Sequence, residues 1–230
     1  MADASGQTAT DAREVGPPAS PPAYRSGISQ QTWDEFNQAV ADLPGITPTE
    51  QYVYAKIFAG EGGAGNDPNS SASSGILRQA LRDAQAANVP GLDGVANPRD
   101  LTIEQRTILY QFYTDRAFHT VGGGAALDTI PDPQTAAAVA DTLFRHGNSG
   151  GAGIVQKSIN DVIGGLPADE RQRLGVSSVD LDGAMGPETF DTARKLDQSG
   201  YGPALRGKIA DNRLKLTKNP NEKSRFDDFR

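Results

Sequence analysis

Residues 52–76, with the sequence YVYAKIFAGEGGAGNDPNSSASSGI, join an apolar segment to a loop of small polar residues. Val53 and Ile57 are four positions apart, which places them along one side of a helix. The glycines around Glu61 end that helix, because glycine is weak inside helices and favoured just beyond their ends. The stretch therefore predicts a buried helix that ends at a carboxylic acid and opens into a loop.

The start of this helix is also marked. Thr47 is a suitable N-cap, Pro48 suits the first helical position, and Glu50 completes a capping box. A carboxylic acid at the far end of such a helix could serve as the general acid of glycosidic cleavage. A solvated helix end is the ordinary use of glutamate beside glycine, so position alone leaves both interpretations of Glu61 open.

Helical periodicity continues through most of the chain, which predicts an almost all-α protein. At most a small β-ribbon is expected near residues 174–182. Residues 1–30 are rich in Ala, Ser, Gly and Pro and are predicted to be a disordered arm, and residues 218–230 form a charged tail. The predicted helices cover residues 31–43, 47–60, 75–88, 102–118, 132–144, 154–163, 187–197 and 201–217.

Composition excludes several classes of function. The formal net charge of −7 argues against sequence-independent nucleic-acid binding, which requires clustered Lys and Arg. There are no cysteines and only two histidines, so we expect no metal and no other cofactor. No segment is long and apolar enough to predict a membrane span, and the first 15 residues lack the features of a Sec signal peptide.

Three short motifs around the opening stretch carry a family resemblance. They are Glu-Gly-Gly at 61–63, Asn-Asp-Pro at 66–68 and Gly-Ile at 75–76. Their order resembles the start of the glycoside hydrolase family 108 muramidases, which include phage endolysins and muramidases used in bacterial secretion.

Later motifs follow in the order of that family, so the resemblance spans roughly residues 50 to 217. They are LYQFY at 109–113, VADTLFRHGNSGGAGIVQKSIN at 139–160, VDLDGAMGPETFDTARKL at 179–196 and DNRLKL at 211–216. The resemblance implies a lysozyme-like helical catalytic region over residues 31–146. It also implies a helical peptidoglycan-binding region over residues 147–217.

The resemblance implies that Glu61 is the catalytic acid. Asp67 is the nearest candidate for a second carboxylate, although an Asx-turn before Pro68 is the more common use of an aspartate in this position. Asp115 is a further acidic candidate, with a solvated helix position as its alternative. The candidate substrate-binding residues are Ser70, Ser74, Tyr113 and Asn148. Tyr113 and its neighbour Tyr110 could instead belong to the core.

The chain departs from the family pattern at several positions. An Asp and a Gly-Gly-x-Thr sequence are missing from the loop after Pro68. Thr114 stands where a Trp is expected, and Arg145 replaces the Asp that follows Phe144. The missing side chains are of kinds that can position a water molecule or a sugar. Their loss therefore affects the expected rate of catalysis more than the expected class of substrate.

Three hypotheses follow. The chain is a muramidase that hydrolyses the β-1,4 bond between N-acetylmuramic acid and N-acetylglucosamine, a lytic transglycosylase acting on the same bond, or a non-catalytic peptidoglycan-binding protein. The expected partner in each case is peptidoglycan. We expect synthesis in the cytoplasm, export through a holin or a secretion machine, and action in the periplasm, the cell wall or outside the cell.

Overall fold

The computed structural model of the chain describes residues 18, 28–61, 72–73 and 76–216. Within these ranges nearly all regular structure is helical, which confirms the predicted all-α fold. The α-helices are α1 (Gln30–Ala41), α2 (Pro48–Gly60), α3 (Arg78–Ala86), α4 (Ile103–Ala117), α5 (Pro133–Gly164), α6 (Ala168–Leu174), α7 (Pro187–Leu196) and α8 (Gly202–Leu216). Shorter elements are the 3₁₀ turns η1 (Pro98–Asp100), η2 (His119–Val121) and η3 (Gly124–Thr129), and the π-helical turn η4 (Asp197–Tyr201).

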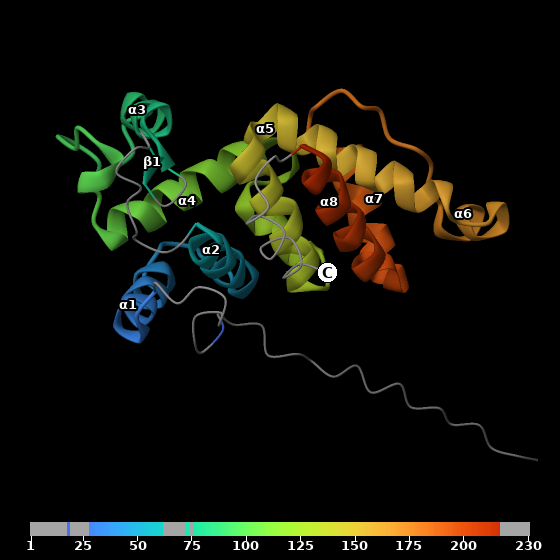
Figure 1. Ribbon diagram of the computed structural model, residues 1–230, viewed down its shortest axis with the longest axis horizontal. Coiled ribbons are helices and arrows are strands. Elements are labelled where there is room, and N and C mark those ends of the chain that lie inside the picture. Colours follow the sequence, from blue (N-terminus) through green and yellow to red (C-terminus); the bar gives the residue numbers. More distant parts are fainter. Residues whose placement is uncertain (1–17, 19–27, 62–71, 74–75, 217–230) are drawn as a thin grey trace, which may run out of the picture.

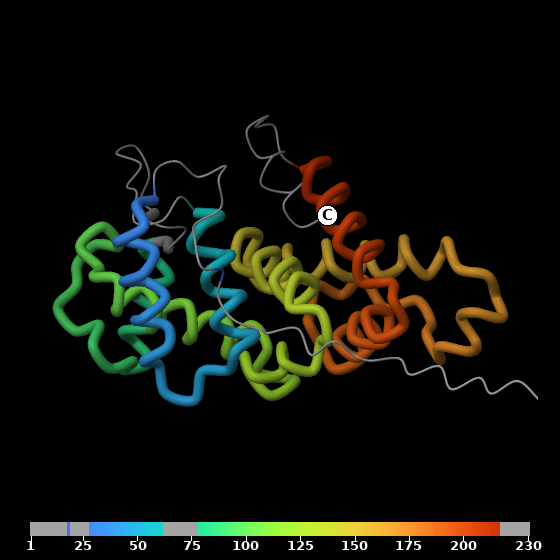
Figure 2. Tube along the Cα trace, turned by 90° about the horizontal axis from the view of Figure 1, so that it is seen from below, coloured from blue at the N-terminus to red at the C-terminus, as the bar shows by residue number. Residues whose placement is uncertain are grey.

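The helices form an elongated body, and after α6 the chain turns back so that α7 and α8 lie near the middle (Figure 1). Helices α1 to α4 occupy one end and α6 occupies the other. The long helix α5 lies between them, and α8 packs along it (Figure 2). None of the helices in the described part of the chain has the length and apolar character needed to cross a membrane.

The core of the first end is an aromatic cluster built on α1, α2 and α4. The rings of Phe36 and Phe58 stack with their centroids 3.9 Å apart, and Tyr110 meets Phe36 edge-on. Trp33 is fully buried, and its indole N–H donates to the carbonyl of Pro18 over 2.8 Å. Trp33 and Phe36 are both fully buried, so this face of α1 belongs to the core.

Side-chain caps fix where α2, α4 and α5 begin, and the cap of α2 is the one predicted from the sequence. At the start of α2 the backbone N–H of Thr47 donates to Glu50, and the Glu50 N–H donates to the Thr47 hydroxyl. Thr102 and Gln105 form the same capping box at α4. Asp132 caps α5 by accepting a hydrogen bond from the N–H of Gln134. These bonds satisfy donors that the first helical turn leaves without partners.

Helix α5 contains a kink at Gly147, where φ is 71° and ψ is 163°. The sequence predicts a turn at 146–151 between two separate helices; in the structure the second helical segment resumes directly after the kink. The two segments pass close to each other at Gly151. A Cβ atom there would lie 2.5 Å from the Cα of Leu143, so only glycine fits without a backbone shift.

The β-ribbon expected near residues 174–182 is not found there, so that prediction is wrong in position. The backbone of this segment bonds to side chains of α5 and not to a second strand. Asn160 exchanges two hydrogen bonds with the backbone of Val179, and Gln156 accepts from the N–H of Gly183. The two-stranded antiparallel ladder that the structure does contain joins β1 (Ala72–Ser73) to β2 (Ile76–Leu77), with Ala72 opposite Leu77.

Helix α8 is bonded to both segments of α5, on either side of the kink. Arg213 forms a buried ion pair with Asp141 of the first segment, with 2.7 Å between Nη1 and Oδ2. The neighbouring Asn212 donates to Ser158 of the second segment over 3.1 Å. The boundary predicted between residues 146 and 147 thus coincides with a kink that α8 spans.

Candidate active site

Glu61 caps the C-terminal end of α2, the most deeply buried helix of the first end. Its backbone N–H donates to the carbonyl of Ile57 over 2.9 Å, which continues the helical bonding pattern by one residue. Its side chain is only 10% exposed. The carboxyl group therefore stands at the edge of the core, held in place by the helix that precedes it.

The carboxylate of Glu61 forms an ion pair with Arg145 of α5. The distance between Arg145 Nε and Glu61 Oε1 is 3.0 Å, and the arginine side chain is 21% exposed. A charge-assisted hydrogen bond of this kind, partly shielded from water, is stronger than an exposed ion pair. A general acid donates a proton to the leaving group, and in this structure Oε1 of Glu61 is engaged by the Arg145 guanidinium.

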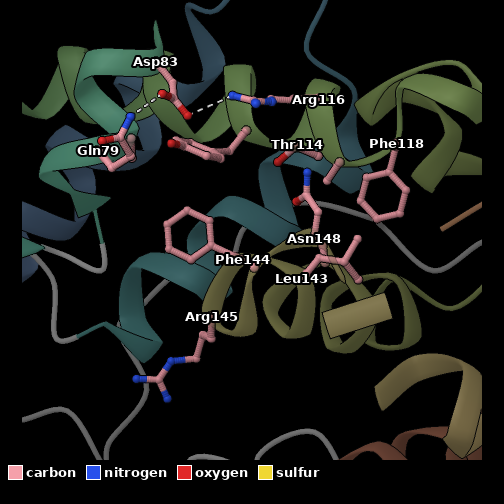
Figure 3. A pocket seen from close by; sticks show the side chains of 14 residues that line it. Gln79, Asp83, Thr114, Arg116, Phe118, Leu143, Phe144, Arg145 and Asn148 are labelled. Atoms are coloured by element: carbon pink, nitrogen blue, oxygen red, sulfur yellow. Dashed lines mark hydrogen bonds and ion pairs between the residues drawn. The ribbon is translucent and has the colours of Figure 1, made fainter. Parts of the chain in front are cut away.

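A pocket of about 320 Å³ lies between α3, α4 and α5, next to this ion pair (Figure 3). Its apolar wall includes Phe118, Leu143 and Phe144, and its polar residues come from all three helices. Arg145 lines the pocket at its edge, and its side chain extends away from α4 (Figure 3). Arg145 therefore belongs both to the pocket and to the ion pair with Glu61.

Two of the predicted substrate-binding residues, Tyr113 and Asn148, line this pocket. The ring of Tyr113 meets Phe144 edge-on, with 6.3 Å between centroids. Burial, reinforced by the nearby negative charge of Asp83, raises the pKa of Tyr113 to about 12, so its hydroxyl stays protonated at neutral pH. Asn148 is exposed and points toward α4 (Figure 3).

The kink in α5 sets the positions of the residues around it. Arg145 lies two residues before the non-helical Gly147, and Asn148 directly follows it. Both line the same pocket although the chain changes direction between them. The positive φ of Gly147 makes that change of direction possible.

The charged residues lining the pocket are Asp83, Arg116 and Arg145. Arg116 Nη1 lies 3.0 Å from Asp83 Oδ2, and Gln79 donates to the other oxygen of Asp83 over 2.7 Å. These bonds lower the pKa of Asp83, which keeps it negatively charged. The second arginine is paired with Glu61, which does not line the pocket.

Other predicted residues have different places. Asp67, Ser70 and Ser74 lie outside the described residues. Asp115 is exposed, and its carboxylate accepts a hydrogen bond from the backbone N–H of Gly124 over 2.9 Å, which is a structural use. Tyr110 is fully buried in the aromatic cluster, so it belongs to the core.

The Asp-Gly segment near residue 182 is a turn held by one buried amide. Gln156 donates to Asp182 over 2.6 Å and to the carbonyl of Ala184 over 2.9 Å. The Asp182 side chain also accepts from the N–H of Ala184, as in an Asx-turn. These bonds explain the Asp and Gly residues of this segment as parts of a turn. No group of three or more His, Asp or Glu residues suited to a metal occurs in the part of the chain that the structure describes.

Several residues of the pocket were missed by sequence analysis. No sequence motif includes Gln79, Asp83 or Arg116. They come together because α3 packs against α4, which the sequence alone does not show. Arg145 was noticed as a departure from the family pattern, but helical spacing cannot show a partner on another helix. The ion pair with Glu61 became visible only with the packing of α2 against α5.

Comparison with protein-family models, with curated proteins and with solved structures found no match to this chain.

Proposed function

We propose that this chain binds the glycan strands of peptidoglycan and cleaves the β-1,4 bond between N-acetylmuramic acid and N-acetylglucosamine, with Glu61 as the general acid. One observation carries the proposal: Arg145 links Glu61 to a pocket lined by Tyr113 and Asn148. Glu61, Tyr113 and Asn148 come from three separate motifs of the family resemblance. Tyr113 and Asn148 line one pocket, and Glu61 is paired with a third residue of its lining, which supports a common site.

The proposed chemistry requires Glu61 to protonate the leaving oxygen as an oxocarbenium-like centre develops. Because the resting carboxylate is paired with Arg145, this pair must separate before the acid can act. Hydrolysis also needs a second group to direct water, and Asp67 remains the candidate. A lytic transglycosylase uses a hydroxyl of the sugar in place of water, so one acid suffices for that form of the reaction.

A second candidate function is peptidoglycan binding without cleavage. The ion pair between Arg145 and Glu61 favours binding without cleavage, because it holds the side chain of the proposed acid. Arg145 stands at the position where the resembled family has an aspartate. If the ion pair kept Glu61 from acting as an acid, a glycan could still bind in the pocket. In both cases the substrate lies outside the cytoplasmic membrane, and we propose that the protein acts there after export.

The test is a turbidity assay on purified peptidoglycan, with the wild type beside Glu61→Gln. The substitution keeps the size of the side chain and removes the acid. We expect wild-type clearing to fall by roughly 10²–10⁴-fold in the variant, which is the usual contribution of a general acid. Glu35→Gln is the matched control, because Glu35 is exposed on α1 and bonds only to Gln31 among the described residues.

Analysis of the products then identifies the reaction. A reducing sugar end indicates hydrolysis, and an anhydro sugar indicates transglycosylation. If neither the wild type nor the variant clears the suspension but both sediment with peptidoglycan, the binding function replaces cleavage. If the folded wild type neither clears nor sediments, both proposals fail.

A further inference from the structure

A second cavity, of about 600 Å³, lies at the end of the body that holds α6 (Figure 1). Its wall is formed by the last turns of α5, by α6 and by the segment 175–178. Ile163 and Val176 are buried and give the wall its apolar part. The proposed cleavage reaction does not use this cavity.

Polar side chains in this wall are left without a partner within the described part of the chain. They include the half-buried guanidinium of Arg171 and the hydroxyls of Ser177 and Ser178. The guanidinium has five N–H donors in a planar fork, and each hydroxyl can donate as well. Donors that face a cavity without an acceptor favour a ligand with oxygen acceptors.

The charge of the wall comes from Arg171, and no acidic residue is among the described residues that line the cavity. Glu170, the next residue along α6, is bonded to Arg173. Lys195 lies 3.3 Å from the carbonyl oxygen of a lining glycine, but it is paired with Asp191. The wall therefore presents one positive charge, which favours an anionic ligand.

Two helices end at this cavity, and the free carbonyls of a helix end disfavour an anion. Here, backbone N–H groups beyond the helix ends occupy carbonyls of both last turns. The N–H of Leu166 donates to Ile163 over 3.1 Å at the end of α5. The N–H of Val176 donates to Arg171 over 3.2 Å at the end of α6. These bonds reduce the partial negative charge that the helix ends present to a ligand.

We propose that this cavity binds the terminal carboxylate of a peptidoglycan peptide stem. The carboxylate pairs with the guanidinium of Arg171, which matches it with two parallel hydrogen bonds. The side chain of a terminal alanine is small and apolar, and it packs against Ile163 and Val176. The identity of the partner rests on the proposed function, but the site does not depend on cleavage.

The cavity shares α5 with the pocket beside Glu61. Asn148 lines that pocket and Gly164 lines this cavity, and the helix rises about 24 Å between them. A stem bound at the cavity tethers its glycan strand to the protein. The tether raises the effective concentration of glycosidic bonds near Glu61.

The first experiment is an NMR titration of the full chain that follows the backbone amides of Ser177 and Ser178. The probes are N-acetyl-D-alanyl-D-alanine, the same dipeptide with a C-terminal amide, and inorganic phosphate. The proteins are the wild type, Arg171→Gln and the control Arg173→Gln. Arg173 is exposed on the same helix and does not line the cavity, so its variant loses the same charge elsewhere.

We expect the dipeptide acid to bind the wild type at least about tenfold more tightly than the dipeptide amide does, the scale of one hydrogen bond to a charged group. Arg171→Gln should weaken binding of the acid by a similar factor and leave the thermal unfolding midpoint unchanged, because the side chain has no partner to lose. Arg173→Gln should bind as the wild type does. Equal binding of acid and amide, or binding of phosphate as tight as that of the acid, overturns the inference.

Sedimentation separates this inference from the proposed function. We expect Arg171→Gln to sediment less than the wild type with intact peptidoglycan, and equally with strands whose stems an amidase has removed. If the wild type sediments with both materials and the dipeptide acid shifts neither amide, the stem site fails while glycan binding stands. If the dipeptide acid binds but the wild type sediments with neither material, the proposed function fails and a peptidoglycan stem is overturned as the ligand.

Discussion

At the scale of single residues, two glycines of α5 offer a matched pair. A Cβ at Gly151 would lie 2.5 Å from the Cα of Leu143 and 2.7 Å from the carbonyl oxygen of Thr142. Both are backbone atoms, which cannot turn aside as a flexible side chain can. We expect Gly151→Ala to lower the free energy of unfolding by about 1–3 kcal/mol, the usual cost of overpacking, measured by urea denaturation.

Gly153 is the control for this prediction. It lies two residues further along the same helix, and a Cβ there would meet nothing within 4 Å. Gly153→Ala should raise the free energy of unfolding by up to about 1 kcal/mol, because alanine is the better helix former. Equal effects at the two positions would show that the close approach to Leu143 does not determine stability.

Glu50 gives a prediction about pH. Burial raises its pKa above the ordinary value of 4.5, against the opposing effect of its hydrogen bonds with Thr47. Its contribution to stability is therefore most favourable below pH 4.5 and is lost as pH rises through the higher folded-state value. Glu50→Gln keeps a carbonyl for the capping box and removes the titration.

We expect the free energy of unfolding of Glu50→Gln, relative to the wild type, to increase as the pH rises above 4.5. Urea denaturation at a series of pH values measures this difference. The exposed Glu35→Gln serves as the control for loss of a carboxyl group. A relative stability that stays level or falls over this range would contradict the prediction.

Single residues were predictable where their partners are close in sequence. The position of Glu61 at a helix end follows from the glycines beside it, and the structure confirms that position. Its pairing with Arg145 links residues 84 positions apart, and no local pattern encodes such a pairing. The role of Glu61 as a catalytic acid stays a prediction.

At the scale of elements, Gln156 and Asn160 hold the segment 177–184 against α5. Gln156 accepts from the N–H of Gly183 over 3.0 Å, and Asn160 accepts from the N–H of Val179 over 2.8 Å. Each amide proton should exchange slowly with solvent only while its side-chain partner is present. We expect Gln156→Ala to speed exchange at Gly183 much more than at Val179.

Asn160→Ala is the reciprocal control and should speed exchange chiefly at Val179. Hydrogen–deuterium exchange followed by NMR resolves the two amides. Equal acceleration at both sites in each variant would mean that the segment opens as one unit and that the two side chains do not act separately.

The elements themselves were largely predictable, because helix starts depend on nearby caps and on periodicity. The capping box at Thr47 is confirmed. The expected β-ribbon near 174–182 was wrong, since the backbone partners of that segment are side chains about 20 residues earlier on α5.

At the scale of the whole molecule, α8 joins the two segments of α5. The buried pair between Arg213 and Asp141 binds the first segment, and Asn212 binds the second. Trp33, the only tryptophan, lies in α1 at one end of the body, away from α8, and is buried there. It therefore reports unfolding far from α8.

We expect Trp33 fluorescence and far-ultraviolet circular dichroism to show one coincident unfolding transition. Arg213→Met should shift both midpoints together and lower the free energy of unfolding by about 3–5 kcal/mol, because it leaves Asp141 buried beside an apolar side chain. Arg82→Gln, which removes an exposed arginine, should leave both midpoints in place. A dichroism transition that shifts while the Trp33 transition does not would instead indicate two units that unfold independently.

This arrangement could not be predicted from the sequence. The family resemblance suggested two regions that meet after residue 146, and the kink at Gly147 lies at that point. Which elements α8 bridges depends on long-range packing, because its partners on the first segment of α5 are about 70 residues away. The resemblance supplies the order of the motifs but not the contacts between them.

The kink at Gly147 also restricts how this sequence can change over generations. Its combination of φ at 71° and ψ at 163° is a backbone region that glycine alone adopts readily. Any other residue there would strain the joint that α8 spans, and the strain could be relieved only by changes elsewhere in the chain. Among related sequences, residue 147 should therefore remain glycine. Gly153 and Gly164 of the same helix should accept other residues, because a Cβ atom at either position would meet nothing within 4 Å.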